Sequence, residues 1–226
     1  MIMKRIVLSL IAAIVCTSLS AQKIVTSDSS VKEEMNSIRV ALHGGYGYRI
    51  GSVPEGLDQA SQDYLKELKH CISYGADVTW YFMPSIGAGV RFSDIRTSNE
   101  NMIGSDRIDI WFLGPEFSYR GTSRNERHNF IASYAMGYAG YFNRTALSSV
   151  PVKISGGSLG YMMDISYDYC ITKKIALGAS VSCLAGSVSK FRCKTFSGES
   201  QTAELGGDTR ESLMHMDVSV GVRFYL

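Results

Sequence analysis

The sequence predicts an all-β fold: an eight-stranded antiparallel up-and-down transmembrane β-barrel with four long extracellular loops and short periplasmic turns. Apolar residues alternate with small or polar ones at period two, the charges of these runs fall on one face, and long connections alternate with short ones. With 226 residues, 45% of them hydrophobic, and a formal net charge of +2, the chain suits one folded domain and is too apolar to be disordered. The balance of acids and bases argues against nucleic acid as a partner.

The first segment has the pattern of a secretory signal peptide. Lys4 and Arg5 precede an apolar run over residues 6–15, and small residues follow up to Ala21. Cleavage is expected after Ala21, with Ser20 as the alternative. A membrane anchor would need ~20 apolar residues, which is more than this run offers. Removing Lys4 and Arg5 from the 23 basic residues leaves 21, equal to the 21 acids.

The predicted organisation has three parts: a signal peptide over 1–21, a periplasmic N-terminal tail over 22–37 and the barrel over 38–226. Four cysteines follow the signal peptide, too few for a framework of disulfide-stapled loops: Cys71, Cys170, Cys183 and Cys193. Whether Cys71 and Cys193 pair is open, because spacing alone cannot show it.

Eight runs alternate between an apolar or aromatic face and a face of small, polar or charged residues. They lie at 38–49, 72–82, 86–93, 108–119, 130–142, 159–169, 175–183 and 214–226. Most are close to the 9–11 residues with which a tilted strand crosses a bilayer. The fourth run is less regular, since Ile110 and Phe112 fall on the face of small residues. A bulge near Gly114 and Pro115 is the expected explanation.

The connections differ in length in the way that outer-membrane barrels require. Long loops are expected at 51–70, 94–106, 143–158 and 187–212, and short turns at 83–85, 120–127 and 172–174. An even number of strands places both ends of the barrel sequence at the short-turn, periplasmic end.

The charges within the runs indicate which face is outside. All lie on the face of small residues, and none on the apolar face: Arg39, Arg49, Asp77, Arg91, Glu116, Asp164, Asp168, Asp217 and Arg223. A soluble barrel such as a lipocalin encloses its apolar face, whereas a membrane barrel turns that face outward. Small residues suit a cramped interior, and aromatic residues near strand ends suit membrane interfaces. We therefore expect the charges, with His43 and His215, to form an internal salt-bridge network rather than a proton or ion pathway.

The final run is the most specific part of the sequence. Residues Asp217–Leu226 look like the C-terminal strand signal that the barrel-assembly machinery reads, with Leu226 where the terminal aromatic residue usually stands. From Ile38 to Leu226 the chain thus resembles the small outer-membrane β-barrel proteins of the OmpA/OmpX type. The resemblance implies a porin-like barrel domain in the outer membrane of a Gram-negative bacterium, in contact with outer-membrane lipid and lipopolysaccharide. It supplies no catalytic motif.

Two of the expected loops carry features that suit surface contact. In the first, Leu57, Tyr64, Leu65 and Leu68 recur at helical spacing after a capping segment at 52–55. A short amphipathic helix is expected there, either as a lid over the barrel mouth or as a recognition surface. The last loop mixes Lys190, Arg192 and Lys194 with acids, which suits an extracellular ligand without naming one.

No catalytic, cofactor-binding or metal-binding residue is predicted. His43 and His215 point inward, His128 lies by a periplasmic turn and His70 in a loop, so no His–Ser pair is expected on the lipid face. The cysteines lack ligand spacing. The predicted function is a non-enzymatic, plugged outer-membrane barrel with a structural or adhesive role exercised through its loops. The alternatives are a barrel-embedded lipid A-modifying enzyme and a secreted lipocalin-like carrier.

Overall fold

The computed structural model describes residues 37–51, 59–100, 104–147, 150–195, 200–204 and 210–226, all within one unit that spans Asn36–Leu226. The predicted signal peptide and almost all of the predicted periplasmic tail lie outside the described residues. Within the described ranges, no helix is both long and apolar enough to cross a membrane.

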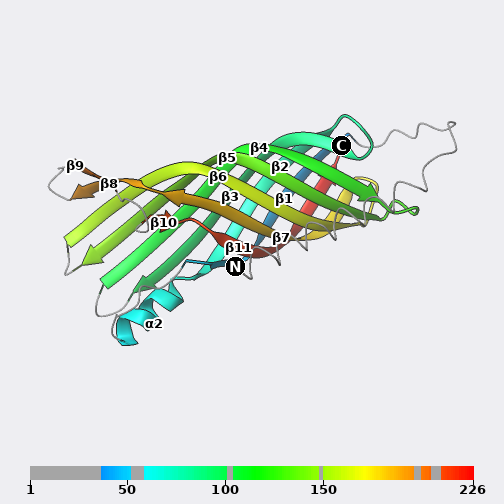
Figure 1. The fold of residues 1–226 in the computed structure, drawn as a ribbon. Coiled ribbons are helices and arrows are strands. Elements are labelled where there is room, and N and C mark those ends of the chain that lie inside the picture. Colours follow the sequence, from blue (N-terminus) through cyan, green and yellow to red (C-terminus); the bar gives the residue numbers. More distant parts are fainter. Residues whose placement is uncertain (1–36, 52–58, 101–103, 148–149, 196–199, 205–209) are drawn as a thin grey trace, which may run out of the picture. The chain divides into compact units, whose positions relative to one another are not determined.

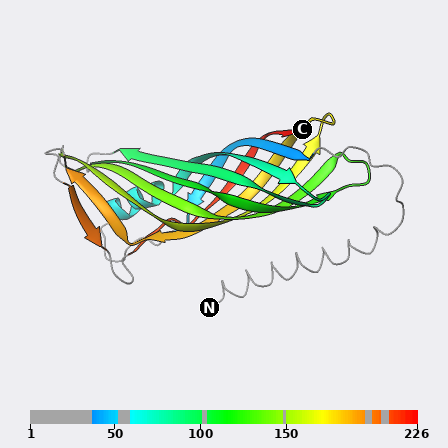
Figure 2. The ribbon, with the colours of Figure 1, turned by 90° about the horizontal axis from the view of Figure 1, so that it is seen from above.

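Eight antiparallel strands close into a barrel, as predicted (Figures 1 and 2). They are β1 (Ile38–Arg49), β2 (His70–Tyr81), β3 (Ile86–Glu100), β4 (Gly104–Thr122), β5 (His128–Leu147), β6 (Val150–Cys170), β7 (Ile175–Val188) and β11 (His215–Tyr225). Each strand from β1 to β6 pairs with the next one in sequence, β7 pairs with β11, and β11 pairs with β1. At this seam the backbone N–H of Ile38 donates to the carbonyl of Leu226 at 3.0 Å, and the N–H of Leu226 donates back at 2.8 Å.

The two ends of the barrel differ. Short turns join β2 to β3, β4 to β5 and β6 to β7 at the end where the C-terminus lies (Figure 1). The opposite end, called the hairpin end below, carries α2 (Gln59–Glu67) and the added strands β8 (Lys190–Thr195), β9 (Ser200–Glu204) and β10 (Glu211–Ser212). The helix expected in the first long connection is therefore present. Leu57, one of the residues that predicted it, lies outside the described residues.

The loops expected at 94–106 and 143–158 are wrong, because the chain continues there as strand. β3 and β4 stay paired as far as Glu100 opposite Ser105, and β5 and β6 as far as Leu147 opposite Val150. The expected loop at 187–212 also contains paired strand, since β8 extends the sheet from β6 and β9 pairs with β8. The strands of these two hairpins remain hydrogen-bonded to each other well beyond the ends of the eight runs predicted from the sequence.

β4 shows why that alternation was misread. Buried and exposed residues alternate without interruption from Trp111 to Arg120, and the register with β5 is the same before and after Gly114 and Pro115. The expected bulge is therefore wrong. Ile110 and Phe112 share the inward face with Glu116, and each is 1% exposed. The strand keeps its geometry while the chemistry of its two faces changes.

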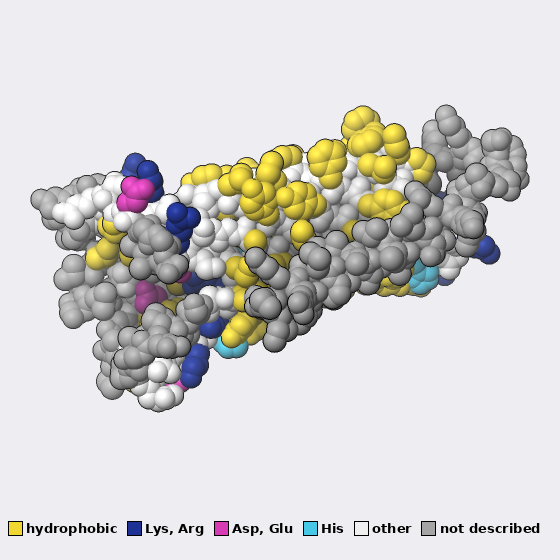
Figure 3. Space-filling model, in the orientation of Figure 1, with side chains coloured by type: hydrophobic (Ala, Val, Ile, Leu, Met, Phe, Trp, Pro, Cys, Tyr) yellow, Lys and Arg dark blue, Asp and Glu magenta, His cyan; other side chains and the backbone are white. Residues whose placement is uncertain are grey.

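This change divides the wall into two zones. On the short-turn side of the wall, the outer face is apolar and highly exposed: Phe117 and Val220 are each 65% exposed, and Phe130 is 61% exposed. On the face shown in Figure 3, hydrophobic side chains form a band across the wall, called the apolar belt below. The inner face of the same zone carries the charges. Toward the hairpin end the inner face becomes apolar and the outer face becomes polar, as expected where a wall passes from lipid into water.

Candidate functional site: a barrel filled in two layers

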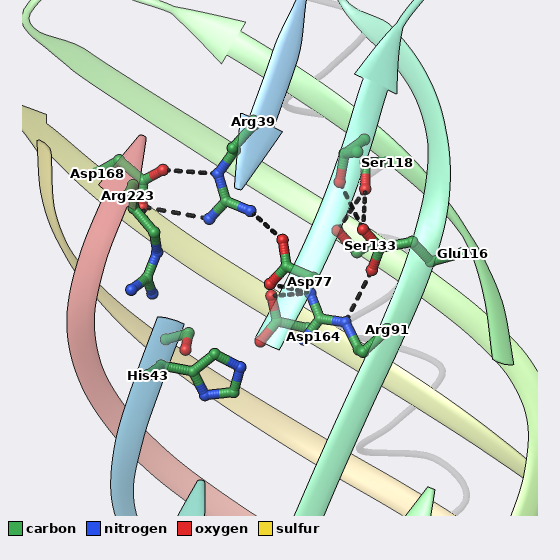
Figure 4. A network of polar contacts seen from close by, with 12 residues as sticks. Arg39, His43, Asp77, Arg91, Glu116, Ser118, Ser133, Asp164, Asp168 and Arg223 are labelled. Atoms are coloured by element: carbon green, nitrogen blue, oxygen red, sulfur yellow. Dashed lines mark hydrogen bonds and ion pairs between the residues drawn. The ribbon is translucent and has the colours of Figure 1, made fainter. Parts of the chain in front are cut away.

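The polar layer of the interior is built around two arginines, Arg39 and Arg91, that each contact more than one carboxylate (Figure 4). From β1, the Nη1 of Arg39 lies 2.6 Å from Asp77 and its Nε lies 2.9 Å from Asp168. On β11, the Nε of Arg223 lies 3.4 Å from the second oxygen of Asp168. The phenol of Tyr225 also donates to Asp168, at 2.7 Å. Asp168 thus joins three side chains from the two strands that close the barrel.

Arg91 on β3 is the centre of the second half of this layer. Its Nε lies 2.7 Å from Glu116, and its Nη2 lies 3.2 Å from Asp164 and 3.5 Å from Asp77. All four side chains are at most 4% exposed. The hydroxyl of Thr79 donates a hydrogen bond to the Glu116 carboxylate at 2.6 Å. Because an unpaired buried charge costs several kcal/mol, this mutual pairing is what allows ions to fill the interior.

The predicted salt-bridge network is confirmed for seven of its nine charged residues. His43 and His215, which were also expected in it, hydrogen-bond uncharged groups instead. Asp217 accepts a hydrogen bond from Ser182 at 2.5 Å instead of pairing with an arginine. Arg49 lies toward the hairpin end and pairs with Glu211 at 2.7 Å, a residue that the sequence had placed in a loop. Asp164 and Arg223, which a soluble barrel would expose, are 4% and 1% exposed.

The four histidines occupy three kinds of place. His43 and His215 point inward as predicted: His43 lies 3.3 Å from the hydroxyl of Ser219, and the Nδ1 of His215 lies 3.0 Å from the carbonyl of Leu213. His128, by a short turn, lies 2.6 Å from the phenol of Tyr167.

The expectation that His70 lies in a loop is wrong, since it is the first residue of β2 and hydrogen-bonds the Tyr46 phenol. Sequence reasoning also missed the contact of His43 with Ser219, which depends on the register between β1 and β11. This pair lies inside the barrel, where the ring of His43 packs against Gly75.

The cysteines and acids of the described residues offer no further site. Cys71, Cys170, Cys183 and Cys193 are all unpaired, so the possible Cys71–Cys193 disulfide is not formed. In the part of the chain that the structure describes, no group of three or more His, Cys, Asp or Glu is arranged to hold a metal ion.

The second layer of the interior is apolar and lies toward the hairpin end. Its members come from seven strands and the segments next to them: Cys71, Ile95, Ile108, Ile110, Phe112, Ala135, Ala139, Tyr141, Met162, Leu184, Val188, Phe191 and Leu213. α2 is packed over this layer through Leu68, which is 5% exposed and follows its last turn, and through Tyr64 and Leu65. The helix therefore covers this layer as a lid would, and its use as a recognition surface stays a prediction.

Polar contacts attach the lid to the hairpins. The phenol of Tyr64 donates to Asp106 on β4 at 2.7 Å, and the amide of Asn99 on β3 donates to Glu67 at 2.7 Å. Partial burial and the hydrogen bond to Asp106 raise the pKa of the Tyr64 phenol. The lid is thus held by both apolar packing and hydrogen bonds, and below it lie an apolar layer and then an ionic one.

Comparison with known proteins places this arrangement among barrels of the same kind. No family model matches the sequence, and no curated protein matches it. The structure is similar to that of Neisserial surface protein A, with a TM-score of 0.54 and 11% identity over 84% of this chain and 97% of that one. A major outer membrane protein from Thermus thermophilus has a TM-score of 0.54 at 9% identity, covering 83% of this chain and 98% of that one.

OprG from Pseudomonas aeruginosa is also similar, with a TM-score of 0.51 and 10% identity over 85% of this chain and 98% of that one. The chain has the fold of these small outer-membrane proteins, an antiparallel β-barrel of eight strands. This outer-membrane barrel meets lipid with its apolar belt, so the expected localisation in the outer membrane is confirmed. The alternative of a secreted lipocalin-like carrier is wrong, because its enclosed face would be apolar where this one is ionic.

Proposed function

We propose that this outer-membrane barrel is a non-enzymatic surface protein, in which a plugged cylinder anchors the hairpins that recognise an extracellular ligand. The observation that carries the proposal is the filling of the interior in two layers under a docked helix. Arg39 and Arg91 cross-link carboxylates of several strands, and Phe112 and Leu68 belong to the apolar layer above them. An eight-stranded barrel has room for side chains and little else, so these layers leave no conduit for solutes.

The hairpins supply the surface that such a protein would use. β8 and β9 pair beyond the wall, and their outward side chains include Lys190, Arg192 and Lys194, all exposed. Ordered strands lose less conformational entropy on binding than flexible loops do, which favours recognition by a preformed surface. Since one fold hosts many functions, the absence of catalysis is part of the proposal and needs its own test.

Three measurements on the refolded protein in lipid test the proposal. We expect no ion conductance in planar bilayers, no change in the mass of lipopolysaccharide after incubation, and no cleavage of acyl-ester or peptide substrates. Bacteria that display the protein should adhere to immobilised glycans or matrix proteins more than bacteria that display a variant in which a short turn replaces residues 191–203. Conductance, a mass change or substrate turnover would contradict the proposal, as would equal adhesion by both strains.

A further inference from the structure

Four basic side chains lie directly opposite one another on four neighbouring strands near the hairpin end. Arg107 on β4 pairs with Arg144 on β5, Arg144 pairs with Lys153 on β6, and Lys153 pairs with Lys194 on β8. All four are exposed on the outer face. With neighbouring strands about 4.8 Å apart, the row extends over about 14 Å. We call these four residues the basic row.

The basic row is electrostatically unbalanced. Like charges directly opposite each other destabilise a sheet. Among the ion pairs of the described residues, none includes a member of the row. Arg96 and Lys190, also exposed and near the hairpin end, do pair with Asp94 and Glu204. A counter-ion from outside the chain would therefore relieve repulsion that the described part of the protein leaves in place.

An aromatic surface, formed by Trp111 and Tyr138, lies on the membrane side of the row. Trp111, Gly140 and Gly157 form one register row across β4, β5 and β6. A Cβ added at Gly140 would collide with the Trp111 indole, and one at Gly157 would collide with the phenol of Tyr138. The two rings therefore lie along the backbone of glycines, with their centroids 5.3 Å apart. Between this surface and the row, the Arg144 guanidinium lies 5.0 Å from the centre of the Phe142 ring.

The height of the row matches the head groups of the surrounding lipid. Trp111, Phe142 and Leu159 are the last large apolar residues on the outer faces of their strands, and the row lies two to six residues beyond them. At about 3.3 Å per residue and a tilt of about 45°, this is about 5–14 Å beyond the apolar belt. On the face shown in Figure 3, basic side chains gather beyond the end of the belt.

We propose that the basic row binds the phosphate groups of the glycolipid in the outer leaflet, lipopolysaccharide, while Trp111 and Tyr138 contact the same molecule below its phosphates. Phosphate supplies the missing negative charge, and guanidinium and ammonium groups donate charge-assisted hydrogen bonds to it. The lipid is the favoured source of phosphate because a membrane-held ligand meets the row and the aromatic surface at once. Clusters of basic residues at a membrane surface are attracted to anionic lipids in this way.

Tryptophan fluorescence can test this binding directly. The chain has two tryptophans, Trp80 and Trp111, so Trp80→Phe leaves one reporter at the proposed site. This protein, in maltoside micelles at low ionic strength, is titrated with diphosphorylated lipid A and with chemically dephosphorylated lipid A. We expect a Trp111 signal that saturates with the phosphorylated lipid at a concentration at least tenfold lower than with the dephosphorylated one.

Two variants with the same change of charge give the matched comparison. Arg107→Gln, Arg144→Gln, Lys153→Gln and Lys194→Gln together remove the row. In the control, the same replacement is made at the short-turn end: Arg124, Arg127, Lys173 and Lys174. The row variant should lose at least tenfold in affinity for phosphorylated lipid A together with most of its salt dependence, and the control should lose neither. Both must keep the heat-dependent gel shift of a folded barrel.

Several outcomes would overturn the proposal. Equal affinity of the row variant and the control for phosphorylated lipid A would exclude the row as the binding site. Equal affinity for the two forms of lipid A would exclude phosphate as the recognised group. Tighter binding of a soluble polyanion such as heparin than of lipid A would assign the row to an extracellular glycan. These readouts are independent of the adhesion and conductance tests of the proposed function.

Discussion

The membrane-spanning part of the wall and its extension at the hairpin end are made from the same strands with opposite distributions of side chains. Along β4, the outward residues pass from Phe117 and Leu113 to Asp109 and Arg107, and the inward ones from Glu116 to Phe112. The pairing partners and the alternation are continuous through the change. The comparison teaches that the solvent outside the wall, lipid or water, decides which face is apolar, while backbone geometry remains constant.

The same comparison explains why the interior needs two kinds of packing. Within the membrane, the outer face cannot supply polar groups, so the inner face holds ions that must satisfy one another. Beyond the membrane, the wall behaves like that of a water-soluble barrel and encloses apolar side chains. α2 then covers the end of this enclosed layer, which would otherwise face water.

The largest effect is expected from breaking the ionic layer at its centre. Arg91→Ala would leave Glu116 and Asp164 buried without their arginine, which should destabilise the barrel by about 3–5 kcal/mol. Urea unfolding of the protein in lipid vesicles, followed by the gel shift, measures this loss. Arg107→Ala on the exposed face is the control and should change stability by at most about 0.5 kcal/mol. Similar losses for both arginines would contradict the two-zone description.

The apolar layer should respond to a change in volume. Phe112→Ala would leave a cavity between packed side chains and should cost about 3 kcal/mol. Phe117→Ala removes the same group from the lipid-facing side, where acyl chains can fill the space, so its cost should be smaller. The same unfolding experiment compares the two variants. A larger loss for Phe117→Ala would show that Phe112 is not part of a packed interior.

The boundary between the zones can be located by placing a charge on the outer face. Met136→Arg lies at the middle of the apolar belt on β5 and should cost about 2 kcal/mol, because lipid-facing arginine is most costly near the midplane. Ser187→Arg, on the exposed hairpin end of β7 and opposite the uncharged Ser212, should be close to neutral. Folding equilibria in vesicles test both changes. Equal costs would mean that the change of side-chain chemistry does not mark the edge of the membrane.

The smallest effect is expected from loosening the lid. Tyr64→Phe removes the hydrogen bond to Asp106 and should weaken the docking of α2 by about 1 kcal/mol. Because docking raises the pKa of this phenol, its contribution should be complete below pH ~10 and should decline as the pH rises further. Hydrogen exchange of the α2 amides should therefore accelerate at alkaline pH in the wild type beyond the general effect of pH. In Tyr64→Phe this additional acceleration should be absent.

Sequence reasoning captured the membrane zone because one rule, apolar outside and polar inside, holds along every strand there. It identified the buried charges, such as Asp164 and Arg223, from their parity alone. It failed where the rule reverses: the inward Ile110 and Phe112 suggested a bulge, and the paired hairpins around 94–106 were taken for loops. Apolar and polar residues still alternate in these segments, but the apolar residues now point inward. A search for strands whose apolar residues all point outward therefore does not find them.

The contacts between strands needed the register, which the sequence does not contain. The approach of Ser219 to His43 and the alignment of Arg107 with Arg144 each depend on which residues of two strands stand opposite. Each basic residue of the row is ordinary when considered alone. Only the pairing of β4, β5, β6 and β8 brings the four together.

The seam between β1 and β11 has a consequence for the way this protein reaches its final state. Until the last strand arrives, the hydrogen-bonding groups of β1 face either lipid, where they would be unsatisfied, or water. Inside the barrel, Asp168 also needs both strands, because it pairs with Arg39 on β1 and with Arg223 on β11. Membrane insertion and the pairing of β1 with β11 must therefore be concerted, because a barrel that lacks this pairing would not be stable in the bilayer.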